Sequence, residues 1–142
     1  MRGNCLCGAI EFEIVGEVRR LYQCHCSLCR KQSGSTSNSS LLIESENFRW
    51  LDGEDCISSY SRESGFRSDF CSRCGSPVPN PLRQTRYVWV PSGLLDGSIP
   101  LKVGAHLCVG SKASWDAIPE ESVQFEHLPP DLETLFECLR PR

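Results

Sequence analysis

The sequence has no long apolar run, no excess of basic residues and no recognisable leader. A membrane-spanning helix needs about 20 consecutive apolar residues, and no stretch of the chain approaches that length. Lys and Arg number 15 against 18 Asp and Glu, for a net charge of −3, so we do not expect the basic face that nucleic-acid binding requires. The first ten residues, MRGNCLCGAI, lack the apolar segment of roughly 7–15 residues that is typical of a secretory signal. We therefore expect a cytoplasmic protein with neither a membrane nor a nucleic-acid partner.

The length and composition are those of one ordinary globular domain. Apolar residues make up 39% and charged residues 23% of the 142 residues. That is enough material for one hydrophobic core, but not for two. The sequence holds no internal repeat, so we expect residues 1–142 to form a single domain.

Cysteine is the residue type that is unusually frequent, with ten in the chain. Seven fall in three short groups: CLC at 5–7, CHCSLC at 24–29 and CSRC at 71–74. In a reducing compartment, clustered cysteines bind metals or act in catalysis more often than they form disulfides. Thiolates are soft ligands, and tetrahedral sulfur sites hold zinc or iron–sulfur clusters. The other three, Cys56, Cys108 and Cys138, stand alone, and we expect them to pack like small apolar residues.

The spacing of the seven clustered cysteines suggests two metal sites. A C-x-x-C turn brings two thiolates to one ion, and residues i and i+2 of an extended strand share a face. A structural zinc site is closed by four protein ligands, whereas a catalytic site has three and an open position. The partition that fits best places one zinc ion among Cys5, Cys7, Cys71 and Cys74, and a second among Cys24, Cys26 and Cys29.

Other interpretations of these groups stay open, because buried core cysteines or redox pairs have similar spacings. His25 is a tempting additional ligand, since histidine is a common one. The alternation of side chains along a strand would turn His25 away from an ion held by Cys24 and Cys26, so we do not count it as a ligand.

Most of the chain shows the pattern of short strands. Residues 9–14, AIEFEI, place Ile10, Phe12 and Ile14 on one face, which predicts a half-buried strand. Further strands are expected at 21–26, 39–45, 47–50, 56–61 and 87–90, with turns such as DGE at 52–54 between them. Residues 33–40, SGSTSNSS, are expected to form a flexible loop. This arrangement is typical of a mainly β protein, either a sandwich or a folded-over sheet.

The C-terminus follows a helical pattern instead. Apolar residues recur at i, i+3, i+4 and i+7, at Leu132, Leu135, Phe136 and Leu139. Asp131 is a suitable N-cap, and Pro141 ends the pattern. We therefore predict a helical appendage over 129–140 that packs on its own sheet, with self-association as the alternative.

The sequence resembles a known family in five ordered segments: CLCGAIEFEI, CHCSLCRKQSG, FCSRCGSPV, PSGLLDG and AHLCVGSKASW. It is similar to the glutathione-dependent formaldehyde-activating enzyme family, also called centromere-protein-V-like, over roughly residues 3–115. The resemblance implies an Mss4-like fold of folded antiparallel sheets with zinc-binding knuckles. It also implies that the first C-x-C and the last C-x-x-C hold a structural zinc, and that the central C-x-C-x-x-C holds a catalytic one. This agrees with the partition based on ligand number.

The activity implied by the resemblance is that of a carbon–sulfur lyase, in which glutathione and formaldehyde are joined as S-hydroxymethylglutathione. Cys24, Cys26 and Cys29 would be the catalytic metal ligands. A substrate thiol that binds zinc at the open position loses its proton and becomes the nucleophile. Four residues are expected to contact the anionic thiol substrate or to line its pocket: Arg30, His106, Lys112 and Trp115. We expect Trp115 to pack along the pocket wall. His106 is also a candidate proton carrier, since the unperturbed pKa of histidine is near neutral.

Two functions of other classes are weighed against this enzyme. A zinc-stabilised binding or scaffold domain without catalysis needs only the closed four-sulfur site and gains little from a three-sulfur one. A zinc-ribbon nucleic-acid binder is disfavoured by the acidic net charge. The segment SGSTSNSSLLI after the triplet is more polar than the resemblance leads us to expect, which leaves the identity of the thiol and the aldehyde open. The oligomeric state is open as well.

Overall fold

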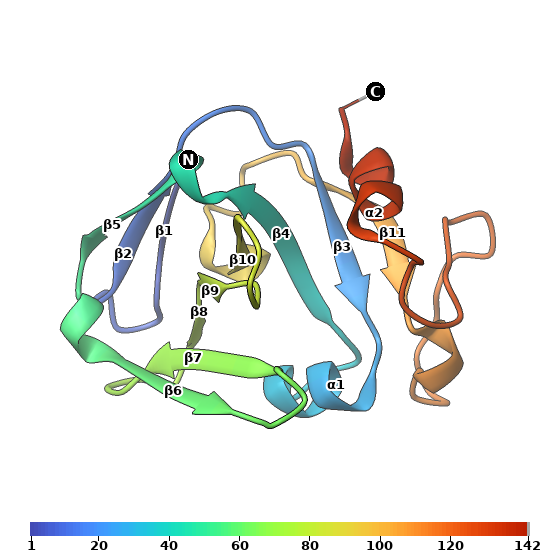
Figure 1. Ribbon diagram of the computed structural model, residues 1–142, viewed down its shortest axis with the longest axis horizontal. Helices are drawn as coiled ribbons and strands as arrows, with labels where there is room; N and C mark the ends of the chain where they lie inside the picture. Colours follow the sequence, from blue (N-terminus) through green and yellow to red (C-terminus); the bar gives the residue numbers. More distant parts are fainter. Residues whose placement is uncertain (142) are drawn as a thin grey trace. The chain divides into compact units, whose positions relative to one another are not determined.

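The structure of the protein is a computed structural model that describes residues 1–141 (Figure 1). The chain forms two compact units. Unit 1 comprises Met1–Glu17 and Leu41–Ile99, and unit 2 comprises Val18–Ser40 and the chain from Pro100 onward. Each unit contains one of the two cysteine clusters, so the units are described in turn.

Unit 1 contains two three-stranded antiparallel sheets. The first has the order β1 (Arg2–Asn4), β2 (Glu11–Ile14) and β5 (Phe48–Asp52), and the second has the order β6 (Ile57–Ser61), β7 (Arg67–Cys71) and β8 (Pro77–Val78). Strand β10 (Tyr87–Pro91) pairs antiparallel with β9 (Asn80–Pro81) and neighbours β4 (Asn38–Glu44), whose second half belongs to this unit. Short 3-10 turns lie at η1 (Ser45–Asn47), η2 (Glu54–Cys56) and η3 (Ser92–Leu94).

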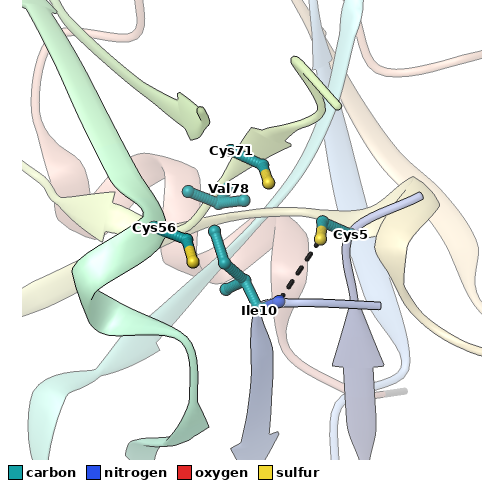
Figure 2. Close-up of a cluster of buried hydrophobic side chains, with 5 residues drawn as sticks. All are labelled: Cys5, Ile10, Cys56, Cys71 and Val78. Carbon is teal, nitrogen blue, oxygen red and sulfur yellow. Dashed lines mark hydrogen bonds between the residues drawn. The ribbon is translucent and has the colours of Figure 1, made fainter. Parts of the chain in front are cut away.

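The core of unit 1 follows the predicted alternation of β2. Ile10, Phe12 and Ile14 are all buried, while Glu11 is exposed, because successive side chains of a strand point to opposite faces. A second buried cluster joins Cys5, Ile10, Cys56, Cys71 and Val78 (Figure 2). Burial of an aliphatic side chain of this size stabilises a fold by roughly 1.5–3 kcal/mol. Two of the predicted metal ligands, Cys5 and Cys71, are therefore also part of the core.

Unit 2 is organised around β3 (Arg20–Cys24). The start of β4 pairs with it antiparallel, with Tyr22 opposite Ser40, and β11 (Lys102–Leu107) pairs with it in parallel. Helix α1 (Ser27–Ser33) follows β3, η4 (Val109–Ser111) follows β11, and α2 (Leu132–Leu139) packs against β3 and β11. The expectation of a mainly β protein with antiparallel sheets and a short C-terminal helix is confirmed. The β3–β11 pair is a parallel exception.

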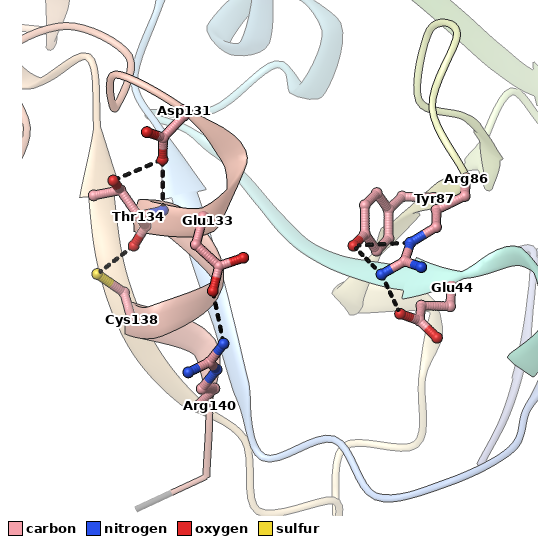
Figure 3. Close-up of polar contacts among 8 residues, drawn as sticks. All are labelled: Glu44, Arg86, Tyr87, Asp131, Glu133, Thr134, Cys138 and Arg140. Carbon is pink, nitrogen blue, oxygen red and sulfur yellow. Dashed lines mark hydrogen bonds and ion pairs between the residues drawn. The ribbon is translucent and has the colours of Figure 1, made fainter.

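Helix α2 has the predicted N-cap. The Asp131 side chain accepts a hydrogen bond of 2.8 Å from the Thr134 amide and another from the Thr134 hydroxyl (Figure 3). Leu135 is the buried residue of the helix, whereas Leu132, at the start of the stripe, is exposed. Figure 3 also shows a polar contact of unit 1, in which Arg86 bonds the Tyr87 hydroxyl and pairs with Glu44.

The predicted flexible loop over 33–40 is wrong. Helix α1 extends to Ser33, Gly34 ends it in the left-handed conformation, and β4 already begins at Asn38. Polar side chains satisfy one another here, since the Asn38 amide donates to Gln32 Oε1 at 2.6 Å and the Gln23 amide to the Ser39 hydroxyl at 3.0 Å. A serine-rich composition therefore hid a strand. Within the described residues, no helix is long and apolar enough to cross a membrane.

Candidate metal centres

Unit 1 gathers four sulfurs, those of Cys5, Cys7, Cys71 and Cys74, hereafter the tetrad. All four Sγ atoms lie within 4.8 Å of one another. The Cys5 and Cys7 sulfurs are 3.6 Å apart, and the Cys7 and Cys71 sulfurs 3.8 Å. Sulfurs around a tetrahedral zinc ion, with Zn–S distances of about 2.3 Å, are separated by ~3.8 Å. The spacing and the all-sulfur donor set therefore fit a structural zinc ion.

Local backbone hydrogen bonds fix the two turns that carry the tetrad cysteines. Cys5 and Cys7 lie in a turn after β1, closed by the Gly8 amide bonding to the Cys5 carbonyl at 3.0 Å, so the expectation that they share a strand face is wrong. The Ile10 amide donates to Cys5 Sγ at 3.4 Å (Figure 2). On the other side, the Gly75 amide donates to the Cys71 carbonyl at 2.8 Å, and Gly75 adopts a left-handed φ of 77°. This φ suits glycine and closes the C-x-x-C turn.

Hydrogen bonds distribute charge unevenly over the tetrad. The Ser76 hydroxyl and amide lower the pKa of Cys74 to about 5. Burial raises the pKa of Cys5, but the Ile10 amide and the neighbouring thiols outweigh it and give a net lowering. The Ala9 amide lowers the pKa of Cys7, but burial and the other three thiols raise it to about 11. A low pKa makes Cys74 the strongest thiolate candidate of the tetrad, which favours cation binding.

Unit 2 gathers three sulfurs, those of Cys24, Cys26 and Cys29, hereafter the triplet, again within 4.8 Å of one another. Cys24 is the last residue of β3, Cys26 is the N-cap of α1, and Cys29 lies in the first turn of that helix. The Cys26 sulfur accepts a hydrogen bond of 3.4 Å from the Cys29 amide, as an N-cap side chain does. The predicted strand at 21–26 ends at Cys24, so a strand end and a helix start bring the sulfurs together.

The triplet concentrates its negative charge on Cys26. Hydrogen bonds from the Cys24 and Cys29 thiols, helped by the Cys29 and Leu28 amides, lower the pKa of Cys26 to about 2. The same contact with Cys26, together with burial, raises the pKa of Cys24 far above its usual range. For Cys29, the Cys24 contact lowers the pKa, but Cys26 and burial raise it to about 12. One thiolate held by two thiols is a donor set that binds a soft cation with release of the remaining protons.

His25 is fully buried between two triplet cysteines, and its ring bonds to other segments of unit 2. Its Nδ1 lies 2.7 Å from Asp116 Oδ2, and its Nε2 lies 3.0 Å from His106 Nδ1. The expectation that His25 is outside the sulfur cluster agrees with these contacts. The reason differs from strand alternation, because β3 has ended one residue earlier.

The lone cysteines differ from one another. Cys56 is buried, as predicted, while Cys108 and Cys138 are only half-buried. Cys108 has a left-handed φ of 57°, which is unusual for a residue with a Cβ atom. Burial raises the pKa of Cys108, and a hydrogen bond with the Cys24 thiol lowers it in part. Cys108 therefore lies beside the triplet without belonging to it.

The four predicted substrate residues are in different surroundings. Arg30 follows the triplet on α1, and its buried Nε has no hydrogen-bond partner among the described residues. The Lys112 ammonium is exposed and donates to the Asp116 carbonyl at 3.2 Å. His106 is 5% exposed. Trp115 is 73% exposed, so the expectation that it packs along a wall is wrong, although its ring is available to a ligand.

Sequence reasoning missed Asp116 and the part that His25 plays. Both residues matter because their side chains, only 10% and 2% exposed, are hydrogen-bonded to each other at 2.7 Å. The two positions are 91 residues apart, and no local pattern connects them. The position of His25 between two clustered cysteines indicated a role near the sulfurs, but the spacing of the sequence did not identify Asp116 as its partner.

Comparisons with known proteins point in one direction. The model of the family described as "Glutathione-dependent formaldehyde-activating enzyme" matches residues 1–111. A protein of Halomonas elongata named "Putative glutathione-dependent formaldehyde-activating enzyme" is 30% identical over 124 residues, which cover 81% of this chain and 78% of that protein. A crystal structure of a Rhodobacter sphaeroides protein superposes with a TM-score of 0.58 at 24% identity, over 70% of this chain and 92% of the other. This last likeness concerns the fold alone.

Proposed function

Because this chain belongs to the glutathione-dependent formaldehyde-activating enzyme family, we propose that it joins a glutathione-like thiol to a small aldehyde at the triplet. The reaction belongs to the carbon–sulfur lyase class, read in its synthetic direction. The observation that carries the proposal is the convergence of Cys24, Cys26 and Cys29 in a chain that also contains a four-sulfur cluster. Four ligands close a structural zinc site, and three leave a position for a substrate.

Both clusters suit zinc, so we propose two zinc ions per chain. The tetrad would hold one ion with four thiolates, and the triplet a second with three. When bound at the triplet, zinc supplies Lewis acidity that favours the ionised form of a thiol. Free thiols have a pKa of about 8.5 and are mostly protonated at neutral pH, so this acidity matters for their reactivity.

The reaction needs one proton to move. The thiol S–H bond breaks, the sulfur electron pair forms the new C–S bond, and the carbonyl π electrons pass to oxygen, which takes up the proton. No redox partner is required. The protein therefore has to hold the two reactants together and exclude competing water, and effective molarities gained by such proximity are large.

Arg30 is the strongest candidate for holding an anionic thiol. Buried donors nearly always have a hydrogen-bond partner, and the Arg30 Nε has none among the described residues. A carboxylate of a glutathione-like molecule would satisfy it, since guanidinium groups bind carboxylates with charge-assisted hydrogen bonds. We propose Lys112 and Trp115 as further contacts, because the first is an exposed cation and the second an exposed ring. His106 is buried and bonded to His25, so we give it the positioning role argued below.

The experiment is an exchange measurement by NMR with glutathione and 13C-formaldehyde. The adduct forms without a catalyst, so the quantity to compare is the rate of exchange between free and thiol-bound formaldehyde. We expect the zinc-loaded protein to raise this rate, and Cys29→Ser to abolish the increase. Cys138→Ser is the matched control, because Cys138 belongs to neither cluster. If the exchange rate with the zinc-loaded protein equalled the rate without protein, the proposed enzyme activity would be wrong. That outcome would favour the alternative, a zinc-stabilised binding domain without catalysis.

We also propose a cytoplasmic location. All ten cysteines are free thiols. Clusters of this kind remain reduced in the cytoplasm, where a glutathione pool would also supply the thiol substrate.

A further inference from the structure

A chain of three buried polar side chains begins between two triplet cysteines. His25 bonds Asp116 through Nδ1 at 2.7 Å and His106 through Nε2 at 3.0 Å. The two imidazole rings are 5.3 Å apart and inclined by 32°. His25 is 1% exposed and His106 5%, so the bond between the two rings is shielded from water. None of the three residues supplies a sulfur, and all belong to unit 2.

Both ring nitrogens of His25 have a partner. An ionised carboxylate can only accept, so Asp116 takes its hydrogen bond from His25 Nδ1. His25 Nε2 lies 3.0 Å from His106 Nδ1, so one of these two nitrogens donates to the other. Every nitrogen of His25 is thereby used, so the ring has one orientation.

Backbone hydrogen bonds also hold His25 and His106 in place. The His25 amide donates to the Leu107 carbonyl at 2.9 Å, next to the pairing of Leu107 with Cys24. The His106 amide donates to the Val123 carbonyl at 2.8 Å, and the His106 carbonyl accepts from Phe125 at 2.8 Å.

Asp116 is held in the same way at the other end. Its amide donates to the Ala113 carbonyl at 3.0 Å, and its own carbonyl accepts from Lys112. The ring bonds therefore tie residue 25 both to β11 and to the segment 112–116.

We propose that His25, Asp116 and His106 are positioning residues for the triplet, holding the backbone between Cys24 and Cys26 so that their sulfurs converge with that of Cys29. This inference rests on the proposed function only in that the triplet binds a metal ion. Groups that orient metal ligands from outside the ligand set contribute to affinity, and their loss costs about 10–100-fold. The tetrad does not depend on these three residues, because its two turns are closed by their own glycines and by Ser76.

The test is a zinc titration of the full-length, metal-free protein against a competing chelator. Two binding steps are expected, and the step missing in Cys26→Ser is assigned to the triplet. In His25→Phe, which keeps the ring and removes both bonds, the triplet step should weaken by about 10–100-fold while the tetrad step is unchanged. His127→Phe is the matched control. His127 is an exposed histidine that bonds none of His25, His106 and Asp116 through its side chain, so its replacement should leave both zinc-binding steps unchanged.

A second pair of variants decides the question if His25→Phe does not fold. Asp116→Asn keeps an oxygen acceptor for His25 Nδ1 and should bind zinc at the triplet nearly as the native protein does. Asp116→Leu has a similar volume without an acceptor and should show the 10–100-fold loss. Equal triplet affinity in the two Asp116 variants would overturn the proposal, and so would an equal loss at both sites, because that indicates general unfolding. The readout is metal affinity, so a protein inactive toward thiol and aldehyde would still give a clear answer.

Discussion

Within each cysteine cluster, one residue has a pKa well below that of a free thiol. In the triplet this residue is Cys26, whose pKa is lowered to about 2 by the Cys24 and Cys29 thiols and by backbone amides. In the tetrad the Ser76 hydroxyl lowers the pKa of Cys74. A thiolate can bind a metal ion first, and the remaining thiols then release their protons as they bind the same ion.

Replacing Cys26 should therefore empty one site only. We expect elemental analysis of the native protein to give two zinc ions per chain, and of Cys26→Ser to give one, because the triplet loses its most acidic sulfur. The tetrad belongs to the other unit and keeps its four sulfurs. Cys138→Ser removes a half-buried thiol outside both clusters and should retain two ions. A native content of one ion, unchanged by Cys26→Ser, would remove the triplet from the list of metal sites.

Gly53 is a second residue on which unit 1 depends. It turns the chain after β5 with a φ of 81°, and an added Cβ atom would lie 2.8 Å from the Ile10 Cα and closer still to the Ala9 carbonyl oxygen. Both are backbone atoms that cannot move aside. We expect Gly53→Ala to lower the free energy of unfolding by about 2 kcal/mol, from left-handed strain and from this overlap.

Urea denaturation is the measurement, with Gly97→Ala as the control. A Cβ atom at Gly97 meets nothing within 4 Å, so its change should stay within roughly 0.5 kcal/mol. Equal effects of the two substitutions would show that the close approach at Gly53 does not limit stability.

At this scale the sequence allowed the seven cysteines to be divided into the same two clusters that the structure forms, because the number of ligands and their short spacings are local information. It did not reveal Asp116, since the contact with His25 joins positions 91 residues apart. Nor did it reveal that Trp115 is exposed, because a tryptophan in a segment expected near a site has no pattern that distinguishes burial from exposure.

Helix α2 begins at a charged N-cap, Asp131. The Thr134 amide and hydroxyl lower the pKa of Asp131. A carboxyl whose folded pKa lies below its unfolded value stabilises the fold above the unfolded pKa, and this contribution is lost as the pH falls through the folded pKa. The unfolded value is about 3.9, so the cap is complete above about pH 4 and weakens below it.

Hydrogen exchange of the α2 amides should therefore become faster on acidification below about pH 4, once the intrinsic pH dependence of exchange is removed. Asp131→Asn is the matched variant, because asparagine caps helices well but does not titrate in this range. Its α2 amides should show a flat protection over the same interval. If the native protein and Asp131→Asn showed the same profile, the carboxylate would not be the group that holds the helix start.

The elements also show which patterns a sequence makes visible. Strand β2 and helix α2 were predicted from their apolar periodicity, which reflects one buried face. Helix α1 has no buried residue, so it has no such stripe, and its residues were taken for a turn and a loop. Strand β4 begins with Asn38, Ser39 and Ser40, whose polar side chains bond residues outside the strand or are buried, a situation that composition alone does not indicate.

For the whole molecule, the decisive difference between the clusters is the length of chain that each one closes. Cys7 and Cys71 lie 64 positions apart, so an ion in the tetrad would join the first turn of unit 1 to the turn between β7 and β8. The triplet spans only six residues, from the end of β3 to the first turn of α1. Cross-linking distant positions restricts the unfolded chain more than cross-linking near ones. Two of the tetrad cysteines, Cys5 and Cys71, also lie in the hydrophobic core of unit 1.

Loss of the two sites should consequently have unequal effects on folding. Structural zinc contributes apparent binding energies of about 10–16 kcal/mol, which is comparable to the entire stability of a typical domain. We expect Cys71→Ser to prevent cooperative folding, and Cys29→Ser to leave a folded but inactive protein whose thermal unfolding remains cooperative. Near-ultraviolet circular dichroism during heating distinguishes the two, and Cys138→Ser is again the control for loss of a thiol. If Cys29→Ser collapsed as completely as Cys71→Ser, the division into a structural and a catalytic site would be wrong, because the short-range cluster would then be as necessary to folding as the one that closes the long loop.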